Sequence, residues 1–100
     1  LMPITRVTVR TFQNKEHAEL FINFAKTSNA ELNNQGLKFN MQLIQSSSLY
    51  NQVICIWTYE NENHMNVLRK VLPQFNSIPN SLVPKEIAYE GEVKVSEDSL

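Results

Sequence analysis

Histidine, arginine and cysteine side chains supply most of the reactive groups in this chain. Histidine exchanges a proton near neutral pH and can act as a general base. His64, near the start of an expected helix, is the candidate catalytic residue, at the edge of a cavity. A boundary histidine without a chemical role is the competing interpretation, because no partner carboxylate can be predicted for it.

The sequence gives little support for a reactive cysteine or for a metal site. The single cysteine, Cys55, cannot form an internal disulfide, and its place in an apolar run suits a buried, unreactive thiol. A structural zinc site needs about four ligands, but the sequence has no His-x-x-x-His pair and no second cysteine. We therefore predict neither a metal nor a cofactor.

Two arginines offer an anion site. Arg6 and Arg10 share one face of an expected strand, and a guanidinium group can hold a carboxylate through two hydrogen bonds. Both are candidate residues for binding a ligand carboxylate. The alternative is structural pairing with Glu90, Glu92 or a partner subunit.

Large apolar side chains offer a second kind of binding surface, because small-molecule sites are mostly apolar with a few polar anchors. The alternative is that these side chains simply form the core, since small domains need their aromatic residues for burial. The candidates for lining a pocket between sheet and helices are Trp57, Tyr89, Phe21, Met41, Met65 and Phe75.

Period-two alternation predicts the strands that must position these residues. The expected strands cover residues 4–12, 37–44, 53–59 and 87–95. The third strand contains an unbroken apolar run, Val-Ile-Cys-Ile-Trp, so both of its faces are expected to be covered. Residues 74–84 are expected to form a long loop of undetermined role.

Helical periodicity accounts for the remaining segments. Asn14 is the expected N-cap of a first helix that ends before Gly36. Its apolar stripe is Ala18, Phe21, Ile22, Ala25 and Leu32, widened by Leu20 and Phe24. Asn61 or Asn63 caps a second helix, which Pro73 is expected to end or kink. The stripe of the second helix is Met65, Leu68, Leu72 and Phe75.

The resulting βαββαβ order predicts one ferredoxin-like α+β domain over residues 1–100, a four-stranded antiparallel sheet with both helices on one face. The helix-facing side chains are expected to be Val7, Val9, Phe39, Met41, Leu43, Cys55, Trp57, Ile87 and Tyr89. The opposite face would carry Arg6, Thr8, Arg10, Lys38, Asn40, Gln42, Ile54, Ile56, Ala88 and Glu90. A solvated face would not normally expose two central isoleucines, so we expect a homodimer through Ile54 and Ile56.

The third strand and the helix that follows resemble a known group. Residues 56–61, Ile-Trp-Thr-Tyr-Glu-Asn, are similar to the dimeric α/β-barrel superfamily, in its antibiotic-biosynthesis-monooxygenase-like branch. The resemblance implies a dimeric barrel and a cofactor-independent oxygenase or a small-molecule binder. Haem-degrading members carry a further tryptophan, where Asn66 stands here, and a later histidine that residues 73–76 lack. Haem chemistry is therefore not implied.

Composition and charge narrow the classes of function that the protein could have. A net charge of −1 gives no electrostatic case for nucleic acid or a membrane surface. With no export signal visible, a cytoplasmic location is the expectation. The main hypothesis is a protein that binds a small apolar or amphipathic, fatty-acid-like molecule in a cavity. The alternative is a cofactor-independent monooxygenase-like enzyme for a small aromatic or quinol-like substrate, and the sequence leaves open whether the protein is an enzyme. A purely structural homodimer is a further alternative.

Overall fold

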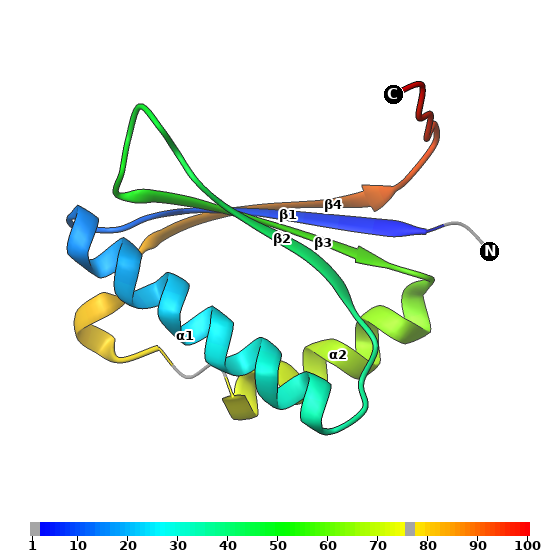
Figure 1. The fold of residues 1–100 in the computed structure, drawn as a ribbon, viewed down its shortest axis with the longest axis horizontal. Helices are drawn as coiled ribbons and strands as arrows, with labels where there is room; N and C mark the ends of the chain where they lie inside the picture. The colour runs from blue at the N-terminus through cyan, green and yellow to red at the C-terminus, as the bar shows by residue number, and fades with distance from the viewer. Residues whose placement is uncertain (1–2, 76–77) are drawn as a thin grey trace.

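The structure, a computed structural model, describes residues 3–75 and 78–100, with the backbone alone at residues 73–75. The described residues form β1 (Ile4–Thr11), α1 (Lys15–Asn34), β2 (Asn40–Gln45), β3 (Gln52–Tyr59), α2 (Glu62–Phe75), a short 3-10 helix (Asn80–Leu82) and β4 (Lys85–Glu92). The strands make one antiparallel sheet in the order β2-β3-β1-β4. Both α-helices lie on the same side of it (Figure 1). This confirms the predicted ferredoxin-like fold.

Helix α1 begins and ends where its sequence indicates. The side chain of Asn14 accepts a hydrogen bond from the backbone N–H of His17 at 2.8 Å. At the other end Gly36 adopts a left-handed conformation with φ of 73°, which costs glycine little. The buried stripe is Ala18, Phe21, Ala25, Ser28 and Leu32. Leu20 and Phe24 were expected to widen this stripe, but they are exposed because they lie on the flank of the helix turned away from the sheet.

Helix α2 is capped by Asn61, whose side chain accepts from the backbone N–H of His64 at 2.9 Å. The helix continues to Phe75, two residues beyond the proline that was expected to end or kink it. The expected loop over residues 74–84 is therefore shorter than predicted. It contains the 3-10 helix, whose Leu82 is buried, and its residues 76–77 lie outside the described part of the chain.

The core lies between the sheet and the two helices. One cluster joins Phe12, Ala18, Phe21, Val53 and Cys55. A second joins Tyr59, Met65 and Leu68. Alternate residues of β3 thus point toward the helices, which cover one of the two faces that its apolar run predicts to be covered.

The sequence-based assignment of faces is wrong for both β1 and β4. Arg6, Thr8 and Arg10 point toward the helices, and Thr8 is only 3% exposed. In β4 the residues directly opposite them are Glu90, Ala88 and Glu86, which share that inner face. The error arises because charged side chains were assigned to the outer face, whereas here arginines on β1 pair with glutamates on β4 beneath the helices.

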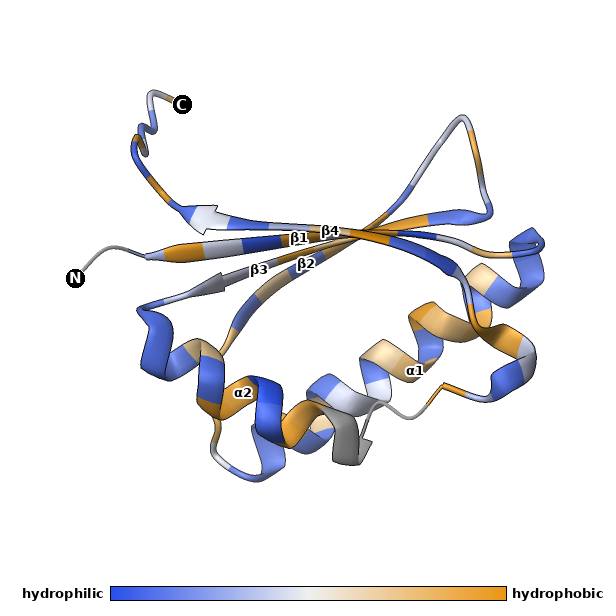
Figure 2. Cartoon of the chain, turned by 180° about the vertical axis from the view of Figure 1, so that it is seen from behind, coloured by the Kyte–Doolittle hydropathy of each residue, from blue (hydrophilic) through white to orange (hydrophobic). Residues whose placement is uncertain are grey.

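The outer face of the sheet is correspondingly more apolar than expected. The pairing register places Ile44, Ile54, Val9 and Ile87 in one row across all four strands. The next row is Gln42, Ile56, Val7 and Tyr89. Tyr89 is 65% exposed and Ile87 57%. Figure 2 shows hydrophobic segments of neighbouring strands meeting at the centre of the sheet. We call these two rows the outer apolar patch.

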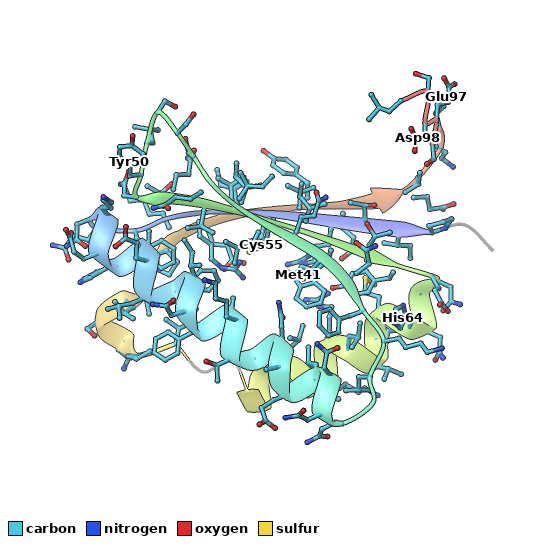
Figure 3. All side chains as sticks on the ribbon, in the orientation of Figure 1. Met41, Tyr50, Cys55, His64, Glu97 and Asp98 are labelled. Carbon is cyan, nitrogen blue, oxygen red and sulfur yellow. The ribbon has the colours of Figure 1, made fainter. Side chains whose placement is uncertain are left out.

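Two projecting segments flank the outer apolar patch. The hairpin between β2 and β3 and the chain after β4 both rise on the side away from the helices (Figure 1). Figure 3 places Tyr50 on the hairpin, and Glu97 and Asp98 on the C-terminal segment. Within the described residues, neither α-helix has the length and apolar content that a bilayer-spanning helix needs.

Candidate functional site

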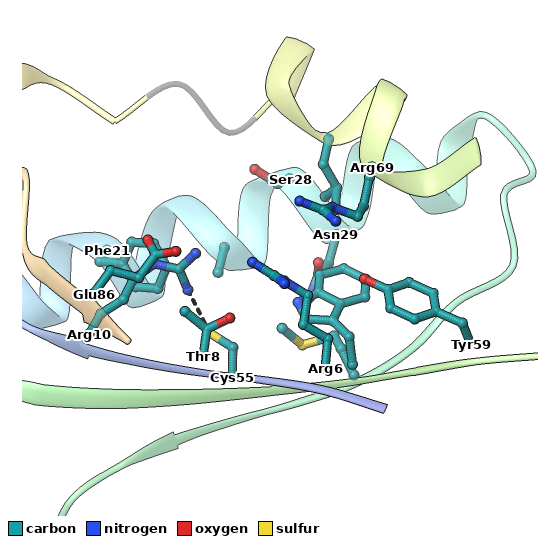
Figure 4. Close-up of a pocket in the computed structure, with 14 residues that line it drawn as sticks. Arg6, Thr8, Arg10, Phe21, Ser28, Asn29, Cys55, Tyr59, Arg69 and Glu86 are labelled. Carbon is teal, nitrogen blue, oxygen red and sulfur yellow. Dashed lines mark hydrogen bonds and ion pairs between the residues drawn. The ribbon is translucent and has the colours of Figure 1, made fainter. Parts of the chain in front are cut away.

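A cavity of about 330 Å³ lies between the inner face of the sheet and the two helices. This volume is at the lower end of the range typical of small-molecule sites. Its apolar lining comprises Phe21, Ala25, Met41, Trp57 and Leu72. Its polar and charged lining comprises Arg6, Thr8, Arg10, Ser28, Asn29, Cys55, Tyr59, Arg69 and Glu86. The cavity is therefore amphipathic, with arginine side chains entering from both β1 and α2 (Figure 4).

Arg10 is held from several sides at one end of this cavity. Its Nε lies 3.3 Å from a carboxylate oxygen of Glu86 on the neighbouring strand. Its Nη1 donates to Cys55 Sγ at 3.5 Å, and its guanidinium carbon lies 5.0 Å from the centre of the Phe21 ring. The buried Nε makes no hydrogen bond of good geometry, so the contact with Glu86 is an ion pair without one. These contacts fix the arginine over the aromatic ring and orient it.

Arg6 and Arg69 lie at the other end of the cavity, with Tyr59 (Figure 4). Arg6 Nη1 is 3.3 Å from Glu90 Oε1, and Arg69 Nη1 is 3.8 Å from that same oxygen. One carboxylate therefore faces two guanidinium groups. Arg6 is the less exposed of the two, with 23% of its side chain accessible against 49% for Arg69.

The charges around the cavity do not balance. In the described part of the chain, Arg6, Arg10 and Arg69 face the carboxylates of Glu86 and Glu90. The arrangement carries one positive charge in excess. Because the cavity walls are partly apolar, this charge is less screened than at an open surface. The site therefore favours an anionic group.

Two lining residues that could ionise are kept neutral. Burial raises the pKa of the Cys55 thiol above its ordinary value of 9.0, although the adjacent Arg10 guanidinium opposes the shift. Burial also raises the pKa of Tyr59 above 10.0, against the opposing charges of Arg6 and Arg69. At neutral pH Cys55 is thus a thiol rather than a nucleophilic thiolate, and Tyr59 is a phenol that can donate a hydrogen bond.

The structure places five of the predicted ligand-binding residues around this one cavity: Arg6, Arg10, Phe21, Met41 and Trp57. Met65 is instead buried in the core cluster with Tyr59 and Leu68. Tyr89 was expected beside Trp57 but belongs to the outer apolar patch, because β4 presents its glutamates inward. The side chain of Phe75 lies outside the described residues.

His64 lies away from this cavity, at the start of α2 (Figure 3). Its Nδ1 accepts a hydrogen bond from the backbone N–H of Glu60 at 3.0 Å, and its Nε2 lies 2.8 Å from the carbonyl oxygen of Lys38. With Nδ1 accepting, the proton resides on Nε2, which donates to that carbonyl. The ring thus ties α2 to the segment before β2. A second hollow of about 340 Å³ adjoins it, beside Phe39 and Thr58.

Several residues that line the cavity were not predicted from the sequence. Tyr59 could have been found, because it follows Trp57 by two positions and shares its face of β3. Arg69 follows Leu68, and nothing in the helical stripe indicates that its long side chain reaches the sheet. No group of three or more histidine, cysteine, aspartate or glutamate side chains in the described residues could hold a metal ion.

No protein-family model matches this chain, and no curated protein matches it in sequence. Solved structures do resemble it. A dimeric ferredoxin-like protein from an uncultured marine organism has a TM-score of 0.75 at 12% identity, covering 100% of this chain and 94% of that one. A second protein of that description and source has a TM-score of 0.66 at 19% identity, with coverage of 97% and 100%.

An enzyme structure is also similar. A mutant of SnoaB, a cofactor-independent oxygenase from Streptomyces nogalater, has a TM-score of 0.75 at 13% identity, with coverage of 96% of this chain and 97% of that one. Identities this low show a common fold. The protein is therefore of the ferredoxin-like α+β class, and it shares this fold with the dimeric marine proteins and with SnoaB.

Proposed function

We propose that the protein is a homodimer that binds a small amphipathic molecule in the cavity between sheet and helices. The observation that carries this proposal is the cavity itself, which combines an aromatic wall with an excess of guanidinium groups. An apolar body would pack against Phe21, Met41 and Trp57. A polar end would meet the arginines, as expected for a fatty-acid-like or aromatic acid.

The outer apolar patch supports the homodimer. Its two rows expose isoleucine, valine and tyrosine side chains across the full width of the sheet. Contiguous apolar surfaces of this kind mark interaction sites in soluble proteins. Two such faces related by a two-fold axis would bury Ile54 and Ile56 at their centre. The marine proteins of the same fold are dimeric, which is consistent with this arrangement.

Native mass spectrometry of gently purified protein tests both parts of the proposal. We expect a dimer mass with an additional few hundred daltons. Ala25→Phe, which fills the cavity from α1, should remove the added mass while keeping the dimer. Ala30→Phe is the matched control, since Ala30 is exposed on the same helix, and it should retain the ligand. A bare wild-type dimer that also takes up no added fatty or aromatic acid would overturn the binding function.

A cofactor-independent monooxygenase-like activity is the second candidate, favoured by the similarity to SnoaB. The cavity could hold a small aromatic or quinol-like substrate against Trp57, with an arginine beside its oxygen. His64 does not line this cavity, so the candidate base would have to act from the second hollow. Oxygen uptake with quinol-like substrates, compared between wild type, Trp57→Phe and His64→Ala, tests this activity. Equal uptake in all three would remove it.

A further inference from the structure

At the end of the cavity that carries Arg6 and Arg69, two guanidinium groups share one carboxylate oxygen. Arg6 on β1 and Glu90 on β4 are directly opposed in the sheet register. Arg69 reaches the same Glu90 oxygen from α2, so three elements meet at one carboxylate atom. Figure 4 shows Arg6 and Arg69 converging from the sheet and from the helix above it.

Glu90 holds these arginines only loosely. Arg6 Nη1 donates a long hydrogen bond of 3.3 Å to Glu90 Oε1, and Arg69 Nη1 lies 3.8 Å from the same oxygen. Both distances exceed the roughly 2.8 Å of a close charge-assisted hydrogen bond. Glu90 belongs to an edge strand and is partly exposed, and ion pairs of that kind contribute little to stability. Arg6 and Arg69 line the cavity, whereas Glu90 is not one of its lining residues. Both guanidinium groups therefore retain donors that an anion inside the cavity can reach.

Arg10 is in a different situation. Its contacts with Glu86, Cys55 and the ring of Phe21 hold it in place. Tyr59, in contrast, lies in the combined field of Arg6, Arg69 and Glu90, and as a neutral phenol it adds a donor to that end of the cavity. The two ends thus differ: Arg10 has a carboxylate of its own and also contacts Cys55 and the Phe21 ring, whereas Arg6 and Arg69 share the single carboxylate of Glu90.

We propose that the ligand is an organic acid whose anionic group binds Arg6 and Arg69, and that Glu90 competes with it for these guanidinium groups. This inference rests on the proposed binding function. The ligand's apolar body extends along Trp57 and Met41 toward Phe21. Glu90 weakens binding of any anion and has no such effect on a neutral molecule of the same shape, so it sets the selectivity of the site.

Calorimetry with 2-naphthoate and 2-naphthamide tests this proposal, because the two probes share a shape and differ in charge. Wild type should bind the naphthoate more tightly. Glu90→Gln should strengthen naphthoate binding by about twofold to fivefold, the size of a partly exposed charge interaction, and leave naphthamide binding unchanged. Arg69→Met should lower naphthoate affinity to that of the amide.

Glu92→Gln is the matched control. It removes the same charge two residues further along β4, where Glu92 pairs with Lys94. An equal gain in Glu90→Gln and Glu92→Gln would show a general charge effect and overturn the competition. Equal binding of both probes by wild type would overturn the anion site while the proposed binding function stands. If neither probe bound to wild type or to any variant, both the anion site and the proposed binding function would be refuted.

Discussion

The proposed homodimer makes a prediction for Ile54, the central residue of the outer apolar patch. Ile54 lies between Val9 and Ile44 in the sheet register, so a lysine there would be surrounded by apolar side chains. Full burial of an isoleucine contributes about 1.5–3 kcal/mol. Ile54 is already half-buried within one subunit, so about 1 kcal/mol of that remains to be gained on association.

Two copies contribute to each dimer, so Ile54→Lys should weaken association by about 2 kcal/mol, or roughly 30-fold in Kd. Repulsion between the two lysines near the two-fold axis would add to this loss, although their flexible stems can carry the charges outward. Sedimentation velocity over a dilution series measures the effect.

Leu20→Lys is the matched control for this experiment. Leu20 is a similarly large aliphatic side chain, 47% exposed on the far side of α1. It should leave the dimer unchanged. A monomeric wild-type protein, or equal weakening by both substitutions, would refute the assignment of the outer apolar patch as the interface.

Three further predictions concern stability. His64→Ala should lower the free energy of unfolding by about 1 kcal/mol, because it removes two hydrogen bonds, to the Glu60 N–H and the Lys38 carbonyl, at an exposed site where water can replace them; an unchanged urea midpoint would contradict the bridging role. Asn14→Ala should cost about 1 kcal/mol through loss of the cap of α1, and Gln13→Ala, outside the helix, should not. Because burial raises the pKa of Cys55, its thiol loses the proton at a lower pH in the unfolded chain than in the folded protein. The free energy of unfolding should therefore fall as the pH rises above 9.0, and Tyr59 should add to the fall above 10.0. Thermal unfolding against pH measures this, and Cys55→Ala should remove the earlier part of the decline; a flat profile in wild type would show that burial does not perturb these groups.

Much of the fold could be predicted from local signals. The Asn14 cap and the left-handed Gly36 bracket α1, and both act within a few residues of themselves. The apolar run of β3 indicates a strand covered on both faces; the helix side is confirmed, and coverage of the outer face stays a prediction. Pro73 is the exception, since the helix continues to Phe75 despite the unfavourable propensity of proline.

The candidate site was predicted only in part. Phe21, Met41 and Trp57 lie on elements whose buried face is set by their own apolar pattern. Tyr89 was misplaced because β4 alternates apolar residues with glutamates, and its apolar set was assumed to point inward. A signal was present in the spacing, because Arg6 and Arg10 are four residues apart, as are Glu86 and Glu90, which suits two cross-strand pairs.

By itself, then, the sequence determined which segments become strands and helices and in what order, because hydrophobic periodicity and end-capping are local properties of the chain. Only the tertiary structure decided which side of β1 and β4 faces the helices. Alternation divides a strand into two sets of residues but does not say which set points inward, and here Phe12, buried at the end of the arginine-bearing set, lies beneath the helices. That choice places the arginines around the cavity and leaves the valines, isoleucines and Tyr89 on the outer face.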